Sequence, residues 1–296
     1  MRRVWKLFVG VGLLVPVGCT VEQPVVRQEP APQVQVKPSV ATTHDFAVPV
    51  LMYHRIDDLT EEESKNKLLA DLTVSPQNFE EQVAYLIENG YTILSVYDVQ
   101  KAILGQSELP EKAVAITMDD GYRDNFVQAF PILQKYGVSA TIFLVGKTVG
   151  SPRHLTWEMV DEMAATGMSY GSHTMTHPDL TTLAIEQQEY ELIESKRLFE
   201  SKIPMPITTL AYPAGRFNAQ VMRHVETAGY LTAWDKGGGP VQPGHDPYRL
   251  PRVRVNGSTT LKQFQRKVES GLWTIMIRQK DSRYANRFAR KLVASR

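Results

Sequence analysis

The stretch AVAITMDDGYRDN, residues 113–125, joins a largely apolar run to two adjacent carboxylates, Asp119 and Asp120, which are followed by Gly121. A nearly continuous apolar run of this length is typical of a buried strand in a parallel sheet. Neighbouring carboxylates repel each other and resist the loss of water, so such a pair is either exposed to solvent or held by a cation. The rest of the sequence decides between an exposed turn and a cation site.

Strand and helix signals alternate on both sides of this stretch. Apolar runs with strand character occur at residues 48–54, 91–95, 139–145, 168–172, 207–212 and 230–234. Helical patterns between them begin at polar capping residues and end near glycine, as at Ser75 and Gly90. This alternation predicts an α/β fold, a parallel sheet covered by helices in a closed or distorted (β/α) barrel. In such barrels the chemistry lies at the carboxyl ends of the strands, where Asp119 and Asp120 are expected.

The composition is that of an ordinary globular protein. The chain has 296 residues, a hydrophobic fraction of 43% and a formal net charge of +1. Proteins that bind nucleic acid carry an excess of basic residues, and this chain has none. We therefore expect no nucleic-acid partner.

The first residues have the layout of a secretory signal. Basic residues precede an apolar run over residues 7–17, which is short for a membrane span, and Cys19 follows the run. Cys19 is the only cysteine, and its position resembles the lipidation site of bacterial lipoproteins, although Pro16 stands where that pattern has an aliphatic residue. We predict an exported lipoprotein of the bacterial cell envelope that faces the periplasm. A plain cleaved signal and an uncleaved anchor are the alternatives.

The predicted signal segment, residues 1–19, is followed by three further parts. Residues 20–46 are rich in Pro, Gln and Val, which predicts a flexible linker. Residues 47–272 form the predicted globular domain. Residues 273–296 are basic, with apolar side chains at helical spacing. This last segment either packs on the barrel with its basic face in solvent or binds anionic lipid or cell-wall polymer.

A second polar cluster follows another predicted strand. The stretch SYGSHTMTHPDL, residues 169–180, places His173 and His177 four residues apart. Two imidazoles and a carboxylate form a common site for a divalent metal such as zinc, iron, cobalt or nickel. A His-x-x-x-His pair alone is a weak signal, and Asp-Asp-Gly is most often a turn. Their joint presence at strand ends favours a metal site, which would supply the cation for the paired aspartates.

These motifs resemble those of the NodB-like polysaccharide deacetylases, carbohydrate esterase family 4. TMDDG, residues 117–121, is similar to the family motif Thr-Phe-Asp-Asp-Gly, and HTMTH, residues 173–177, is similar to His-Ser/Thr-x-x-His. The resemblance extends from about Val48 to Val255. It implies a distorted (β/α) barrel and a metal-dependent deacetylase.

The resemblance also implies a role for each motif residue. Asp120, His173 and His177 would bind the metal, and Asp119 would be the general base that activates the attacking water. A metal polarises the amide carbonyl and lowers the pKa of water from about 15.7 towards roughly 7, and a carboxylate beside it can take the proton. One carboxylate would thus neutralise the cation while its neighbour accepts a proton.

The leaving amine needs a proton donor. The family usually supplies it from a late histidine motif, which is not evident here, since His245 lies in the loop-like context PGHDPY. However, VPVLMYHRI, residues 48–56, resembles the first strand of the subgroup that de-N-acetylates poly-N-acetylglucosamine, in which this histidine is the acid. We therefore predict His54 as the general acid. The alternatives are His245 in that role and a merely structural histidine at position 54.

A third motif matches less completely. LAYPAG, residues 210–215, resembles the family motif Arg-x-Pro-Tyr-Gly, whose backbone N–H beside the proline helps to bind the oxyanion; here that residue is Ala214. Ala211 stands where the family has an arginine that steadies the base. The later segment YRLPRVRV offers a substitute, for which we favour Arg252 over Arg254; either could instead be an ordinary solvated arginine on a strand.

The sequence therefore predicts a metal-dependent hydrolase that removes N-acetyl groups from a β-linked N-acetylglucosamine-containing polysaccharide at the cell envelope. Its expected cofactor is a divalent metal ion, and its expected partners are the acetylated polysaccharide and the membrane through a lipid anchor. The alternatives are a deacetylase of peptidoglycan or of small amides, and a catalytically inactive sugar-binding module. Trp234, at another strand end, would stack on a sugar ring or belong to the core.

Overall fold

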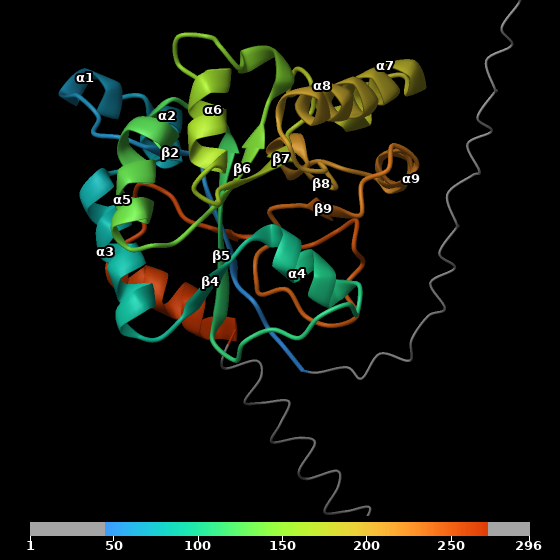
Figure 1. Ribbon diagram of the computed structural model, residues 1–296. Helices are drawn as coiled ribbons and strands as arrows, with labels where there is room; N and C mark the ends of the chain where they lie inside the picture. Colours follow the sequence, from blue (N-terminus) through green and yellow to red (C-terminus); the bar gives the residue numbers. More distant parts are fainter. Residues whose placement is uncertain (1–44, 272–296) are drawn as a thin grey trace, which may run out of the picture. The chain divides into compact units, whose positions relative to one another are not determined.

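The computed structural model describes residues 45–271 (Figure 1). The predicted signal segment with Cys19, nearly all of the predicted linker and the basic segment 273–296 lie outside the described residues. Within residues 45–271, no helix is both long enough and apolar enough to cross a membrane.

The sheet is parallel, as the apolar runs predict. Its strands, in spatial order, are β10 (Val253–Arg254), β1 (Val50–Tyr53), β5 (Ala113–Asp120), β6 (Thr141–Leu144), β7 (Ser169–Ser172), β8 (Thr209–Ala211) and β9 (Thr232–Trp234), while β4 (Thr92–Leu94) pairs with the first half of β5. The sheet curves into a half-barrel surrounded by helices (Figure 1). The prediction of an α/β fold with a distorted barrel is therefore confirmed.

The helices begin where polar caps predict them. The covering helices are α3 (Pro76–Glu88), α4 (Val96–Ile103), α5 (Phe130–Lys135), α6 (Trp157–Ala164), α7 (Ile185–Glu189), α8 (Ser195–Lys202), α9 (Ala219–Thr227) and residues 261–271. The hydroxyl of Ser75 accepts a hydrogen bond from the Asn78 N–H at the start of α3, and Pro76 occupies the first turn. Such a cap satisfies an N–H that the helix itself cannot pair.

Two of the predicted helices contain a π-helical turn. The turn η1 (Asn125–Ala129) precedes α5, and η4 (Tyr190–Glu194) joins α7 to α8. A π turn widens the helix locally and often occurs at functional sites. In each turn a polar side chain is buried: Asn125 is 0% exposed and Glu191 is 5% exposed. Both side chains form hydrogen bonds with loops of the candidate site described below.

The core fills both faces of the sheet with apolar side chains. Trp234 at the end of β9 is completely buried, and its indole N–H donates a 2.6 Å hydrogen bond to the Thr209 hydroxyl. A side chain without exposed surface cannot stack on a sugar. Of the two alternatives for Trp234, the core position is therefore confirmed.

One excursion from the barrel is not evident in the sequence. After β1 the chain forms β2 (Arg55–Ile56), the short helices α1 (Glu61–Ser64) and α2 (Lys67–Leu72), and β3 (Thr73–Val74), which pairs with β2. Neither helix buries a residue completely, and Leu68 on α2 is 67% exposed. The excursion lies at the carboxyl edge of the sheet, beside the candidate site.

Candidate active site

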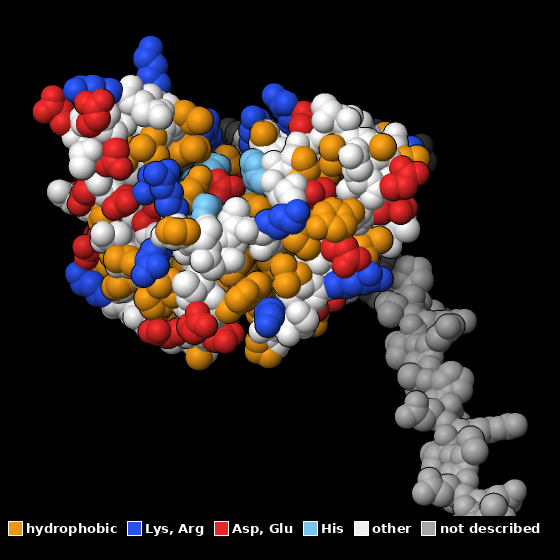
Figure 2. All heavy atoms as spheres, turned by 90° about the horizontal axis from the view of Figure 1, so that it is seen from above, with side chains coloured by type: hydrophobic (Ala, Val, Ile, Leu, Met, Phe, Trp, Pro, Cys, Tyr) orange, Lys and Arg blue, Asp and Glu red, His pale blue; other side chains and the backbone are white. Residues whose placement is uncertain are grey.

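A cavity of about 640 Å³ lies at the carboxyl ends of the parallel strands. Figure 2 shows histidine side chains together with carboxylates in the middle of this face. All seven site residues predicted from the sequence line this main cavity: His54, Asp119, Asp120, His173, His177, Ala214 and Arg252. His245 does not line it. The fold thus brings together residues that are almost 200 positions apart in the chain.

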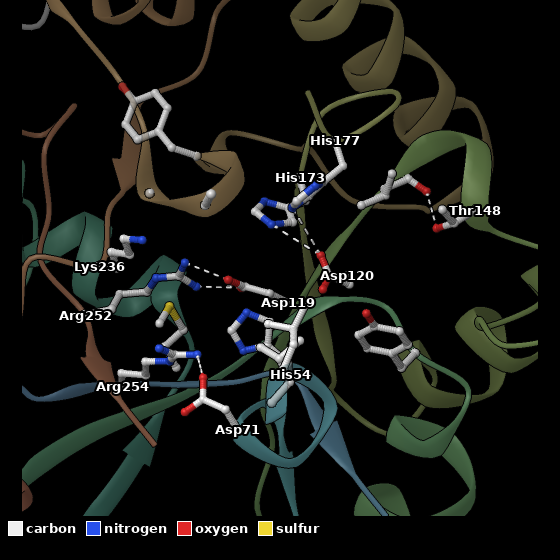
Figure 3. A pocket seen from close by; sticks show the side chains of 18 of the residues that line it. His54, Asp71, Asp119, Asp120, Thr148, His173, His177, Lys236, Arg252 and Arg254 are labelled. Carbon is white, nitrogen blue, oxygen red and sulfur yellow. Dashed lines mark hydrogen bonds and ion pairs between the residues drawn. The ribbon is translucent and has the colours of Figure 1, made fainter. Parts of the chain in front are cut away.

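Three of these residues form a candidate metal centre (Figure 3). Asp120 ends β5, and His173 follows β7 directly. One carboxylate oxygen of Asp120 lies 3.5 Å from Nε2 of His173 and 3.5 Å from Nε2 of His177. One ligand atom from each of the three residues lies within 4.8 Å of the others. A carboxylate and two imidazoles fit a divalent metal such as zinc, nickel, cobalt or iron.

The surroundings of His173 also fit a metal ligand. Its Nδ1 lies 2.7 Å from the carbonyl oxygen of Ala211, which can only accept, so Nδ1 carries the hydrogen. Burial lowers the pKa of His173, although the charges of Asp119 and Asp120 oppose this shift, and the neutral ring is favoured. The lone pair of Nε2 therefore faces a carboxylate oxygen. Two acceptor atoms so placed suit a cation between them, and the bond to Ala211 fixes the ring.

Backbone strain is concentrated at this site. In residues 45–271, the non-glycine residues with positive φ are Asp120 (70°), Thr174 (68°), His177 (62°) and Ala214 (52°). Three of them, Asp120, His177 and Ala214, are predicted site residues, and Thr174 directly follows His173. A β-branched residue such as threonine is rarely found in this region. Strained backbone of this kind persists where the surrounding structure holds it, and it clusters at functional sites.

Asp119 faces away from the histidines, towards Arg252. Its two oxygens accept hydrogen bonds of 2.6 and 2.8 Å from the two terminal nitrogens of the guanidinium (Figure 3). Both side chains are buried, with 1% and 3% of their surface exposed. Burial would raise the pKa of Asp119, but the charges of Arg252 and His173 outweigh it and hold the pKa well below its usual range. Asp119 is therefore a fixed carboxylate.

Arg252 rather than Arg254 provides this contact. Arg252 also donates to the Asp235 carbonyl at 3.1 Å and to the Thr117 hydroxyl at 3.2 Å, so its position is determined by several elements. Arg254 instead pairs with Asp71 of α2 at 2.5 Å. Of the two arginines considered in the sequence, Arg252 is thus the one that contacts Asp119.

His54 follows β1 and reaches the same cavity (Figure 3). Its carbonyl oxygen accepts a 2.9 Å hydrogen bond from the buried side chain of Asn125. The neighbouring Asp124 accepts from the Ile56 N–H at 3.0 Å and thereby holds the same segment. Burial lowers the pKa of His54, against the opposing charges of Asp119 and Asp120. Of the two histidines considered as the acid, His54 is the one that lines the main cavity.

Comparisons with known proteins agree with this geometry. The family model described as polysaccharide deacetylase matches residues 106–233. YxkH of Bacillus subtilis, which is named as a polysaccharide deacetylase, is 35% identical to this chain over 260 residues. These residues cover 84% of this chain and 90% of that protein. This chain belongs to the polysaccharide deacetylase family. The predictions of the family and of an N-deacetylase are confirmed.

Two further relatives of the deacetylase are informative. The poly-beta-1,6-N-acetyl-D-glucosamine N-deacetylase of Staphylococcus epidermidis is 25% identical over 226 residues, covering 70% of this chain and 78% of that protein. The solved structure of the deacetylase PplD of Streptococcus pyogenes, in complex with acetate, is 29% identical, with a TM-score of 0.72 over 76% of this chain and 100% of that one. The deacetylase fold therefore extends across nearly the whole described part of the chain.

The structure adds a positioning residue that the sequence analysis missed. Glu191, in the π turn η4, accepts a 2.8 Å hydrogen bond from the Thr176 N–H and a 2.5 Å bond from the Thr176 hydroxyl. Thr176 directly precedes His177, whose N–H donates to the Thr174 hydroxyl at 3.0 Å. Glu191 thus holds the turn between the two histidines of the deacetylase motif. No local pattern marks it, because a glutamate within a predicted helix is expected on the surface.

Tyr122 and His154 form another part of the cavity wall that sequence reasoning missed. Their rings are stacked, with centroids 5.1 Å apart and planes 20° apart. Both line the main cavity. Burial, reinforced by the charge of Asp120, raises the pKa of Tyr122 to about 12, so its hydroxyl keeps its proton. Tyr122 lies within the opening motif, but its pairing with a residue 32 positions later has no sequence signal.

Proposed function

We propose that this deacetylase removes N-acetyl groups from a β-linked N-acetylglucosamine-containing polysaccharide and that it requires a divalent metal held by Asp120, His173 and His177. One observation carries the proposal: three ligand atoms converge beside Asp119, a buried carboxylate that does not point at them. An inactive sugar-binding module would not need a proton acceptor next to a cation site. The named substrate of the Staphylococcus epidermidis relative supports this substrate class.

In this proposal Asp119 acts as the general base. A divalent cation bound by the three ligands would polarise the acetyl carbonyl and make water a stronger acid. Asp119 accepts the proton of the attacking water through a lone pair that is not used by Arg252. Because the guanidinium holds both oxygens, the carboxylate keeps its orientation while it accepts the proton. Arg252 is a positioning residue in this scheme.

His54 and Ala214 complete the proposed machinery. The imidazolium of His54 donates a proton to the leaving nitrogen, and its lowered pKa makes the charged ring a ready donor. The backbone N–H of Ala214 stabilises the oxyanion of the tetrahedral intermediate. Its left-handed conformation, with φ of 52°, belongs to the short turn η5 (Pro213–Gly215) at the cavity.

The proposal also places the enzyme at the bacterial cell envelope, tethered by a lipid on Cys19. It is supported by the order of basic residues, apolar run and cysteine at the start of the sequence. Expression in a bacterial host followed by membrane fractionation tests it: the wild type should partition with membranes, and Cys19→Ala should be released or remain unprocessed. An unchanged membrane fraction of Cys19→Ala would contradict lipidation.

Acetate release tests the proposed activity directly. The purified protein would be incubated with β-linked N-acetylglucosamine oligomers, with peptidoglycan and with N-acetylglucosamine monomer. We expect turnover on the oligomers, loss of turnover after chelation, and recovery on addition of zinc, nickel, cobalt or iron. Turnover on peptidoglycan alone would replace the proposed substrate. Activity that survives complete removal of metal would contradict metal dependence.

A further inference from the structure

A second cavity, of about 450 Å³, lies next to the main cavity. We call it the arginine cavity, because Arg55, Arg123 and Arg153 line it, together with the acidic residues Asp57, Glu63 and Asp124. Apart from Asp124, which holds the segment of His54, none of these side chains has a role in the proposed reaction. The arginine cavity is therefore a separate feature that needs its own explanation.

The two cavities share a wall made of sequence neighbours. Each arginine directly adjoins an aromatic residue that lines the main cavity, in the pairs His54–Arg55, Tyr122–Arg123 and Arg153–His154. The wall segments are joined to one another: the Arg123 N–H donates to the Arg153 carbonyl at 2.8 Å, and the Arg55 guanidinium lies 5.5 Å from the centre of the Tyr122 ring. A substrate polymer that occupies the main cavity is therefore within reach of the arginine cavity.

The three arginines and three acids of the arginine cavity balance in formal charge, but two of the arginines have hydrogen-bond donors that no acid of the cavity uses. Arg55 forms ion pairs with both Asp57, at 2.9 Å, and Asp124, at 2.8 Å, so these three groups satisfy one another. Among residues 45–271, no ion pair or side-chain hydrogen bond involves the exposed guanidinium groups of Arg123 and Arg153.

Glu63 forms no hydrogen bond with the two guanidinium groups, although its pKa is lowered by the hydrogen bonds from Thr60 and further by the charges of Arg55 and Arg153. It is the remaining acid of the cavity, and its carboxylate accepts hydrogen bonds from the Thr60 N–H and hydroxyl at the start of α1. The guanidinium N–H groups of Arg123 and Arg153 are therefore left to bind solvent or an oxyanion.

We propose that the arginine cavity binds a phosphate or carboxylate group carried by the polysaccharide, near the acetylated sugar that occupies the main cavity. This inference rests on the proposed function for the identity of the polymer. Guanidinium forks match both oxyanions with paired hydrogen bonds, and Arg123 and Arg153 are available to form them. The preferred substrate of this deacetylase is then an anionic or partly anionic polymer rather than a neutral one.

Binding of inorganic phosphate to the full chain, measured by calorimetry at low salt, tests the cavity without any need for catalysis. The Arg123→Ala/Arg153→Ala variant should bind phosphate about tenfold more weakly than the wild type, a loss of the size expected for charge-assisted contacts with partial screening. Glu63→Gln should bind phosphate more tightly, because it removes a negative charge from the cavity lining. Arg223→Ala, which removes an exposed arginine of α9 outside both cavities, is the matched control and should bind like the wild type. Equal affinity in the double variant, or the same loss in Arg223→Ala, would overturn the site.

Kinetics distinguish a substrate group from a free ion. KM would be measured for a neutral N-acetylglucosamine polymer and for the same polymer partly substituted with phosphate or carboxylate groups. In the wild type the substituted polymer should have the lower KM, and the ratio of the two KM values should fall by about 5- to 10-fold in Arg123→Ala/Arg153→Ala. A ratio near unity in the wild type would overturn the polymer as the source of the anion, and phosphate that changes kcat on the neutral polymer would assign the cavity to a free effector. Absence of acetate release from both polymers would instead contradict the proposed function, while the phosphate titration would still decide the cavity.

Discussion

The end of strand β5 carries two neighbouring carboxylates, and the side chains that surround each of them are different. On one side, Asp119 continues the strand, is buried and is held by two hydrogen bonds from Arg252. On the other side, Asp120 has a left-handed backbone and faces His173 and His177. Successive side chains of a strand point to opposite faces, so adjacent residues can serve different chemistry without competing for one space. The paired aspartates are thus two sites that share one strand end.

Asp119→Asn tests the arginine side and should have the largest effect. The amide cannot accept the proton of water, so turnover should fall by about 10⁴-fold, the upper end of the range for general-base catalysis. The three metal ligands are untouched, so the metal content per protein should stay near that of the wild type. Acetate release and metal content, measured across a metal titration, check both statements.

A folding control is needed, because Asp119→Asn leaves the buried charge of Arg252 without its partner. Removing one member of a buried ion pair costs about 3–5 kcal/mol because it leaves an uncompensated buried charge, and removing the second charge as well relieves that penalty. The Asp119→Asn/Arg252→Met variant should therefore melt closer to the wild type and still be inactive. If this double variant recovered activity, Asp119 would not be the base.

His54→Ala extends the comparison to the leaving group. Loss of a general acid should lower kcat by roughly 10² to 10⁴-fold, with little change in bound metal. His245→Ala is the matched control, because His245 was the competing acid and does not line the main cavity. A larger loss of kcat in His245→Ala than in His54→Ala would transfer the role of acid to His245.

Asp120→Asn tests the histidine side of the strand end. It removes the negative charge from a ligand set that otherwise consists of two imidazoles, so metal affinity should fall by more than about 100-fold, beyond the losses typical of residues that only orient ligands. Unlike Asp119→Asn, this variant should regain part of its activity in excess metal. If Asp120→Asn kept its metal while Asp119→Asn lost it, the two roles would be exchanged.

Features that depend on neighbouring residues in the chain were predicted from the sequence, whereas features that depend on contacts between distant segments were missed. Local signals were sufficient for the strands and caps, as at Ser75, and the strand ends gathered the predicted site residues into one cavity. The helices α1 and α2 were missed because they are short and have no buried apolar stripe, and short helices are marginal without one. The arginine cavity was missed for another reason. Its lining comes from distant segments, and nothing local marks Arg123 and Arg153 as neighbours.

The smallest expected effect concerns Glu191, which holds the turn between His173 and His177 through its hydrogen bonds with Thr176. Thr174 and His177 have strained backbones, each costing about 1–3 kcal/mol, and the two hydrogen bonds from Thr176 to Glu191 help to hold them. Glu191→Ala should therefore weaken metal binding by about 10- to 100-fold, the range for residues that orient ligands.

Glu191→Gln should restore most of this affinity, because its amide can accept from the Thr176 N–H and donate to the Thr176 hydroxyl. Glu189→Ala, on the exposed surface of α7, is the control for loss of a helix glutamate. Metal dissociation constants and melting temperatures of the three variants separate positioning from stability, since a residue that only stabilised the fold would lower the melting temperature without changing metal affinity. Wild-type metal affinity in Glu191→Ala would show that the strained turn keeps its shape without this carboxylate. Metal binding beside Asp120 would then depend on the three ligands and not on Glu191.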